Sequence, residues 1–143
     1  MKLNMKILDS SFKHIQGLEE GVNSIDLKME VLREEHFAFQ LLIRADRPFF
    51  CTLGKNRDLH WRGLGDRIRL DIPGFEDLLE LSFLGYVTGD DGSLVGDPIL
   101  RHKSLYLEGW QAVWVQGKIP EGFALKKARA RVCAYYDSGF QRF

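Results

Sequence analysis

The side chains of this chain that could hold a metal ion or transfer protons are its four histidines and its acidic residues. The histidines are scattered, and no two have the spacing of zinc ligands: His14, His36, His60 and His102. The loop Asp-Asp-Gly-Ser at residues 90–93, with Asp97, could offer oxygen atoms to calcium, but it lacks the spacing of an EF-hand loop. An ordinary Asp-Gly hairpin turn is the better interpretation. We therefore predict no metal site and no cofactor.

The acidic residues do not form an obvious catalytic pair either. Adjacent acids occur at residues 19–20, 34–35, 76–77 and 90–91. Glycoside hydrolysis needs two carboxyl groups roughly 5–10 Å apart on either side of the scissile bond, whereas neighbours on a strand point to opposite faces. The chain also lacks a nucleophile elbow, a phosphate-binding loop and a dinucleotide fingerprint. We therefore predict no catalytic residue in this chain.

The aromatic residues could stack on sugar rings, and Trp61 is the best candidate for a ligand contact. It lies in the polar stretch of residues 56–63, and a loop tryptophan among charges is less readily buried. A Trp61 that folds back as a lid on the core fits the same sequence equally well. Trp110 and Trp114 belong to a strand, where the large apolar area of the indole favours the core. We predict that Trp114 is buried between two sheets.

Composition indicates one folded domain and excludes one class of partner. The 143 residues are 45% hydrophobic and 12% aromatic, which suits a single domain with a single core. Basic and acidic residues balance at 20 each, so the chain lacks the charge of a general nucleic-acid binder, and we expect no nucleic-acid partner. A local basic cluster is better explained as a solvated strand face: Lys126, Lys127, Arg129 and Arg131.

The cysteines and the N-terminus bear on the cellular compartment. Cys51 and Cys133 lie in apolar, strand-like segments and are interpreted as two buried thiols, although a single disulfide between them stays open. No apolar run approaches the ~20 residues that span a bilayer, so we expect no membrane partner. Residues 1–9 alternate and lack the apolar region of a signal peptide, which slightly favours the cytoplasm. A chain from which a leader had been removed would look the same.

Alternation of apolar and polar residues dominates the chain and is typical of β-strands. The expected strands are residues 2–8, 25–31, 35–45, 49–53, 67–72, 78–87, 110–119 and 128–136. Residues 88–96 are expected to form a polar loop, and residues 75–79 could instead be a helical turn. Both faces of residues 110–119 are largely apolar, which indicates an interior strand. About eight short strands with Gly and Pro turns predict an all-β fold, a two-layer antiparallel β-sandwich that spans residues 1–143 as one domain.

Three segments in the same order resemble the N-terminal β-sandwich domain of family 123 glycoside hydrolases. Residues 35–43, EHFAFQLLI, are similar to that family's Glu-x-x-x-Phe-Gln followed by aliphatic residues. Residues 85–87, Gly-Tyr-Val, lead through a loop to Asp-Pro-Ile-Leu at 97–100. Residues 111–115, QAVWV, run to Ile-Pro-Glu-Gly at 119–122 and are followed by the strand to Cys133. The chain departs from the family at residues 123–125, Phe-Ala-Leu, where a Gly-x-Tyr step is usual.

The resemblance implies a non-catalytic role for this chain. In the resembled family the sandwich precedes a (β/α)₈ barrel, whose Asp-Glu pair acts on N-acetylgalactosaminides with help from the substrate acetamido group. This chain has no barrel-length region and no Asp-Glu dipeptide, so no catalytic residue is carried over. The resemblance therefore implies a non-catalytic accessory domain, the N-terminal part of a longer glycoside hydrolase-like protein, with the barrel of the same polypeptide as its partner. Trp61 and the other aromatics support an alternative, an independent carbohydrate-binding module with a glycan as its partner.

Overall fold

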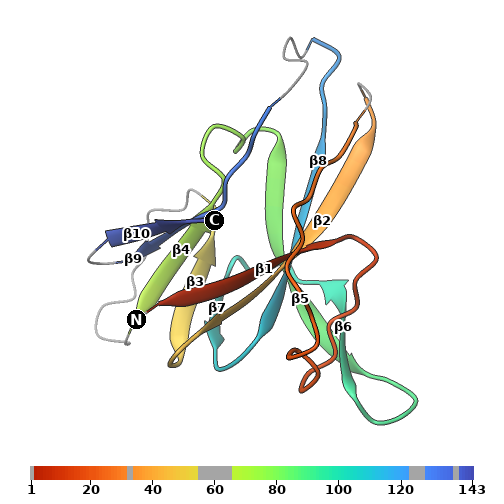
Figure 1. Ribbon diagram of the computed structural model, residues 1–143, viewed down its shortest axis with the longest axis vertical. Coiled ribbons are helices and arrows are strands. Elements are labelled where there is room, and N and C mark those ends of the chain that lie inside the picture. The colour runs from red at the N-terminus through yellow and green to blue at the C-terminus, as the bar shows by residue number, and fades with distance from the viewer. Residues whose placement is uncertain (1, 32–33, 55–65, 123–127, 137–138) are drawn as a thin grey trace.

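The computed structural model describes residues 2–31, 34–54, 66–122, 128–136 and 139–143. These residues form ten strands in two layers and contain no helix (Figure 1). The strands are β1 (Leu3–Asp9), β2 (His36–Ala45), β3 (Phe49–Leu53), β4 (Arg67–Asp71), β5 (Leu79–Thr88), β6 (Leu94–Ile99), β7 (Ser104–Leu107), β8 (Gln111–Lys118), β9 (Cys133–Tyr136) and β10 (Gly139–Arg142). The predicted all-β sandwich is confirmed.

Each layer is a five-stranded sheet. The first sheet has the order β1-β2-β8-β5-β6, and all its neighbours are antiparallel. The second has the order β10-β9-β4-β3-β7, in which β3 and β4 pair in parallel and the other neighbours are antiparallel. The antiparallel prediction therefore holds for every pair except β3 with β4, which are consecutive strands joined by a long connection, as parallel pairing requires.

The core lies between the two sheets because one face of each strand is apolar. The buried cluster includes Phe39, Leu41 and Ile43 of β2, Phe83 of β5, Val113 and Val115 of β8, Phe49 and Cys51 of β3, Ile68 and Leu70 of β4, and Ala134 of β9. Full burial of an aliphatic or aromatic side chain of this size contributes roughly 1.5–3 kcal/mol, so this cluster supplies the main stabilisation. Cys51 and Cys133 are buried free thiols, as predicted, and burial raises the pKa of the Cys51 thiol.

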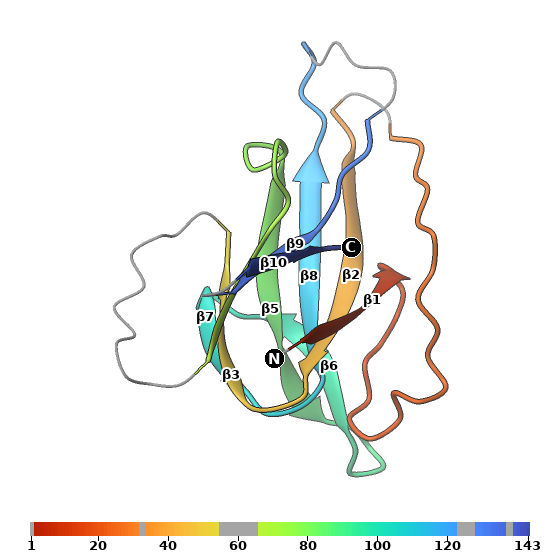
Figure 2. The same ribbon diagram turned by 60° about the vertical axis from the view of Figure 1, so that its left-hand side comes forward.

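The strand expected at residues 25–31 is not present. The segment is extended but irregular, and it lies beyond β1 and β2 at the edge of the first sheet (Figure 2). A single backbone bond, from the Ile25 N–H to the Ile7 carbonyl (2.8 Å), begins a ladder with β1. The Ile7 N–H instead donates to the hydroxyl of Ser24 (2.8 Å), so a side chain takes the place of the next backbone partner. Ile25 and Met29 stay 39% and 41% exposed, whereas Leu27 between them packs against the main core, so the apolar alternation here marks only a partly buried face.

Three strands were not anticipated from the sequence, namely β6, β7 and β10. Part of the polar loop at residues 88–96 is a hairpin turn, closed by a bond from the Gly89 N–H to the Ser93 carbonyl (2.8 Å), with Gly92 at a φ of 83°. This confirms the Asp-Gly turn, and β6 follows it at once. Pro98 lies inside β6, where a proline is tolerated because β6 is the edge strand of its sheet.

The outer face of the first sheet carries a second, smaller apolar cluster. Leu8, Leu42, Leu84 and Ala112 are buried there, with Phe12, Val22, Trp110 and Trp114 packed around them. A loop at residues 10–24, here called the covering loop, supplies Phe12 and Val22 and lies over one part of this face. Trp114 is half-buried on this outer face, so the prediction that it lies between the sheets is wrong. The inward positions of β8 belong to Val113 and Val115.

Candidate functional site

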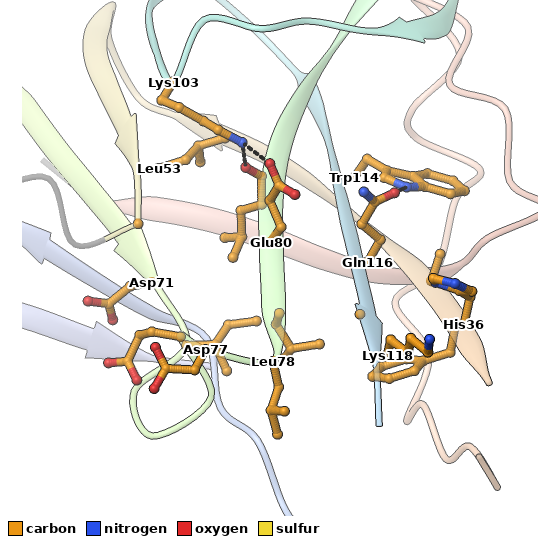
Figure 3. Close-up of a pocket in the computed structure, with 18 of the residues that line it drawn as sticks. His36, Leu53, Asp71, Asp77, Leu78, Glu80, Lys103, Trp114, Gln116 and Lys118 are labelled. Carbon is orange, nitrogen blue, oxygen red and sulfur yellow. Dashed lines mark hydrogen bonds and ion pairs between the residues drawn. The ribbon is translucent and has the colours of Figure 1, made fainter. Parts of the chain in front are cut away.

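A broad hollow of about 1130 Å³ opens around the first half of β5 (Figure 3). Its lining falls into two groups. The edge group comes from the ends of β3 and β4, the turn before β5 and Lys103. The face group comes from the outer side of β2 and β8 and includes Trp114, Gln116 and His36. Gly117 joins the two, because a Cβ at this position would come within 2.6 Å of the Leu78 carbonyl oxygen.

The edge group follows a part of β5 that has only one strand neighbour. β6 pairs with β5 from Leu84 onward, so the backbone from Leu79 to Ser82 pairs with β8 alone. Lys103 covers this edge, since its ammonium donates to the Leu81 carbonyl (2.6 Å) and to the Ser82 hydroxyl (3.0 Å). It also forms an ion pair with Glu80 (3.1 Å). A lysine on an unpaired edge disfavours pairing with another chain, so this contact protects the sheet.

Asp71 is a buried carboxylate in the edge group. Burial raises the pKa of Asp71, the Arg69 guanidinium acts to lower it, and the charge of Glu76 raises it further. A raised carboxyl pKa is a property of general acids. However, Oδ2 accepts a hydrogen bond from Arg69 Nη1 at 2.7 Å, and Oδ1 is fully buried. Arg69 is itself held over the ring of Tyr135, 4.3 Å from its centroid. Neither oxygen of Asp71 is open to a substrate, so the geometry indicates a structural ion pair.

The face group is built around Trp114. Its indole N–H donates to Gln116 Oε1 (3.0 Å), so the polar atom of the ring is already paired within the protein. Gln116 lies directly between Ala38 of β2 and Glu80 of β5 in the register of the sheet. In Figure 3, the Gln116 amide lies beside the Trp114 indole, His36 lies on the same side of the hollow, and Glu80 and Lys103 lie on the other side. The result is an aromatic ring with amide, carboxylate and imidazole groups nearby.

A buried polar network lies outside the hollow, beneath the covering loop. His14 is 1% exposed, and its Nδ1 and Nε2 lie 2.7 Å from the Tyr86 hydroxyl and 2.8 Å from Glu19 Oε1. The Tyr86 oxygen also accepts from the Ala112 N–H (2.9 Å), and the Glu19 carboxylate from the Gly17 N–H (3.1 Å). Both ring nitrogens of His14 therefore have a polar partner within the protein.

This network has the order of a catalytic relay, a hydroxyl, an imidazole and a carboxylate in a row. Its electrostatics are those of a structural contact. Burial raises the pKa of Tyr86 to about 12, with a further contribution from the charge of Glu19, whereas a nucleophile needs a lowered pKa. Because His14 has almost no accessible surface, a substrate cannot reach it. The network therefore anchors the covering loop to β5 and β8.

A smaller hollow of about 390 Å³ lies near the start of β8, lined by Arg44, Tyr106, Glu108 and Trp110 among others. The Lys6 ammonium lies 4.9 Å from the ring centroid of Trp110 and donates to the Glu19 carbonyl (2.8 Å). The Trp110 ring therefore already has a cation as a partner. The smaller hollow is consequently less suited to an added ligand than the face around Trp114.

The structure leaves the predicted ligand contact untested, because Trp61 lies outside the described residues, as do His60, Lys126 and Lys127. Arg129 and Arg131 are exposed, as predicted, but they lie before β9, so they do not belong to a strand face. The described histidines do not come together, since His14 is buried and His36 and His102 are exposed. Within the described ranges no three His, Cys, Asp or Glu side chains are placed to hold a metal ion, and no helix is long and apolar enough to cross a membrane.

Comparison with known proteins gives one fold-level finding. No family model matches the chain, and no curated protein matches it. A solved structure of a family 123 glycoside hydrolase from Clostridium perfringens, studied for the hydrolysis of glycolipid glycans, has a similar fold. The TM-score is 0.66 at 12% sequence identity, and the match covers 100% of this chain and 26% of that one. The chain thus has a fold found in a glycoside hydrolase and spans about a quarter of that enzyme's length.

Sequence reasoning missed two features of this region. The contact between His14 and Tyr86 joins residues 72 positions apart, and no local signal could have revealed it. The sequence did contain a signal for Trp114, because strict alternation places its side chain on the other face of the strand from Val113 and Val115. Those two valines belonged inside, and the tryptophan therefore belonged outside.

Proposed function

We propose that this chain is a non-catalytic accessory domain of a glycoside hydrolase-like protein. In this proposal it corresponds to the N-terminal β-sandwich of that protein, and a barrel in the same polypeptide carries the chemistry. The supporting observation is the fold match, which takes in the whole of this chain but 26% of the glycoside hydrolase chain. Full coverage of one chain and partial coverage of the other is expected when one domain is compared with a larger enzyme that contains a similar domain.

The non-catalytic part of the proposal rests on the described acidic residues. Glycoside hydrolysis uses two carboxyl groups that both reach the substrate. Asp71 is buried and forms an ion pair with Arg69, and Glu80 forms an ion pair with Lys103. Glu19 is held beneath the covering loop by His14. None of these three groups is arranged as one half of an open acid–base pair.

An activity assay of the isolated chain tests this proposal. The chain should release no nitrophenol from p-nitrophenyl β-N-acetylgalactosaminide above the rate without protein. Turnover that Asp71→Asn abolishes and Asp77→Asn leaves intact would show that the chain itself is catalytic. The coding sequence beyond Phe143 is a second test. A barrel-length extension with an Asp-Glu pair would support the proposal, and an immediate stop codon would count against it.

The partly exposed Trp114 favours a second candidate, an independent carbohydrate-binding module. Such a module would bind glycans without a catalytic domain beside it. The predicted contact of Trp61 belongs to this candidate. Titration of the chain with soluble oligosaccharides, followed by tryptophan fluorescence, should give a response that Trp61→Ala reduces if that residue takes part.

A further inference from the structure

The outer face around Trp114 differs from an ordinary solvated sheet surface. Ordinary outer faces of antiparallel sheets are polar, with single apolar residues scattered among them. Here a partly exposed tryptophan lines a hollow of about 1130 Å³, and its N–H is bonded to Gln116. A paired N–H leaves the π-face as the part of the ring still able to take a partner.

We propose that this face binds a neutral pyranose residue of a glycan, with the Trp114 indole as the platform on which the sugar ring stacks. The inference deepens the proposed function by naming a binding site on the accessory domain, and it rests on that proposal for the class of ligand. One side of a pyranose ring presents several C–H groups together, and this apolar side matches an aromatic face. The sugar hydroxyls point outward from the ring edge and need both donors and acceptors.

The polar neighbours of Trp114 supply both. Gln116 uses its Oε1 for the indole, so its amide N–H₂ group points elsewhere as a donor. Glu80, directly opposite Gln116 in the sheet register, has a side chain that is 62% exposed and offers carboxylate oxygens as acceptors. On the β2 side, Gln116 is opposite Ala38, whose small side chain leaves room beside the indole.

The charges around the hollow favour a neutral ligand over an anionic one. Glu80 is paired with Lys103 at 3.1 Å, and Lys118 with Glu34 at 3.0 Å. Lys103 and Lys118 therefore each have an acidic partner, and among the described residues that line the hollow these pairs leave no lysine to select a sialic acid or a phosphate. A neutral sugar avoids the desolvation cost that an anion would meet here.

Trp110 provides an internal control for this interpretation. It comes directly before β8, four residues before Trp114, packs against the same apolar cluster and is also partly buried. Its ring faces the Lys6 ammonium at 4.9 Å, so its π-face already has a partner. If stacking on an available tryptophan is what recognises the sugar, Trp114 should matter and Trp110 should not.

Isothermal titration of the full 143-residue chain tests the proposal. The probes are galactotetraose, chitotetraose and a β-N-acetylgalactosamine-terminated tetrasaccharide as neutral glycans, with a sialic acid oligomer as the anionic comparison. We expect a neutral probe to bind. Trp114→Ala should weaken it by about tenfold or more, the size of effect seen when an aromatic stacking platform is removed from under a base. Gln116→Ala should weaken it by a smaller factor, and Trp110→Ala should leave it unchanged.

Three results would overturn the proposal: no neutral probe binds, only the anionic probe binds, or a folded Trp114→Ala binds like the wild type. If Trp114→Ala does not fold, as judged by its circular dichroism spectrum, the exposed Gln116→Ala decides the outcome. Failure of the proposed function is a separate result. Hydrolysis by this chain would refute the accessory role, whereas loss of the platform would leave that role standing.

Discussion

The two ends of the outer face of the first sheet differ in what covers them. At one end the covering loop lies over Leu42, Leu84 and Ala112, which makes this part a second core. At the other end the covering loop contributes Ser10 alone to the lining of the hollow, and Trp114 is partly exposed there. The same strand, β8, runs through both ends with apolar residues at alternate positions. An apolar strand face therefore becomes core or surface according to what another segment places over it.

Two polar residues hold the covering loop in place. Gln40 of β2 is 2% exposed, and its Nε2 donates to the carbonyls of Ser10 (3.1 Å) and Phe12 (2.6 Å). His14 binds Tyr86 and Glu19 as described, and its own carbonyl accepts from the Gly96 N–H of β6 (2.8 Å). The covered end is therefore fixed by buried hydrogen bonds, whose loss is expensive.

The largest expected effect is the loss of apolar packing at the covered end. Leu42 is 0% exposed, so Leu42→Ala should reduce the free energy of unfolding by ~2–5 kcal/mol through lost burial and the cavity left behind. Trp114→Ala, at the open end, should cost only ~1 kcal/mol, a typical value for a partly exposed site. Urea denaturation measures both. Leu18→Ala is a control with the same chemistry, because Leu18 is 65% exposed. Equal losses for Leu42→Ala and Trp114→Ala would mean that the two ends are packed alike.

A smaller effect is expected from the buried network under the loop. His14→Ala should cost ~1–3 kcal/mol, because it removes a partner from both the Tyr86 hydroxyl and the Glu19 carboxylate. Protection of the loop amides from hydrogen exchange should fall in the same variant, most clearly at Gln16, which donates to the Leu94 carbonyl. His102→Ala, at an exposed position, is the control. If His14→Ala exchanges like the wild type, some other contact anchors the loop.

Single strands show how much of the fold could be predicted from the sequence. β2 and β3 lie where alternation placed them, and Phe39, Leu41 and Ile43 point into the core as expected. Residues 25–31 have an equally regular alternation and form no strand, because the Ser24 hydroxyl takes the N–H that a ladder would need. A period-two pattern shows which side chains share a face of the chain. It does not show whether a neighbouring strand has free backbone groups with which to pair.

The residues of the hollow were harder to predict from the sequence than the strands of the fold. The hollow gathers residues from five strands and the turns between them, and no spacing within any one segment indicates that Gln116 will lie opposite Glu80. Trp114 was assigned to the core because its strand is apolar on both faces, a pattern that strands buried on both sides share with this one. What separates the two cases is the reach of the covering loop, which is set by the long-range contacts of Gln40 and His14.

The smallest expected effect is a difference in pH dependence between the two ends, and it arises at Glu19. Burial acts to raise the pKa of this carboxyl, but the hydrogen bonds from His14 and the Gly17 N–H outweigh it and hold the pKa below its ordinary value of 4.5. In the unfolded chain the carboxyl takes up its proton near the ordinary value, whereas in the folded chain it does so only at lower pH. The unfolded state therefore binds more protons in that interval, and stability rises with pH there.

The contribution of Glu19 is thus complete above about pH 4.5 and is lost as the pH falls through the lower, folded-state pKa. Glu19→Gln keeps the size of the side chain and removes its charge. The difference in free energy of unfolding between wild type and Glu19→Gln, measured in urea from pH 3 to 7, should shrink toward zero at the acid end. Glu20→Gln, at the exposed neighbouring position, should show no such trend. A wild-type advantage that stays constant over the whole range would mean that the charge of Glu19 does not hold the covering loop.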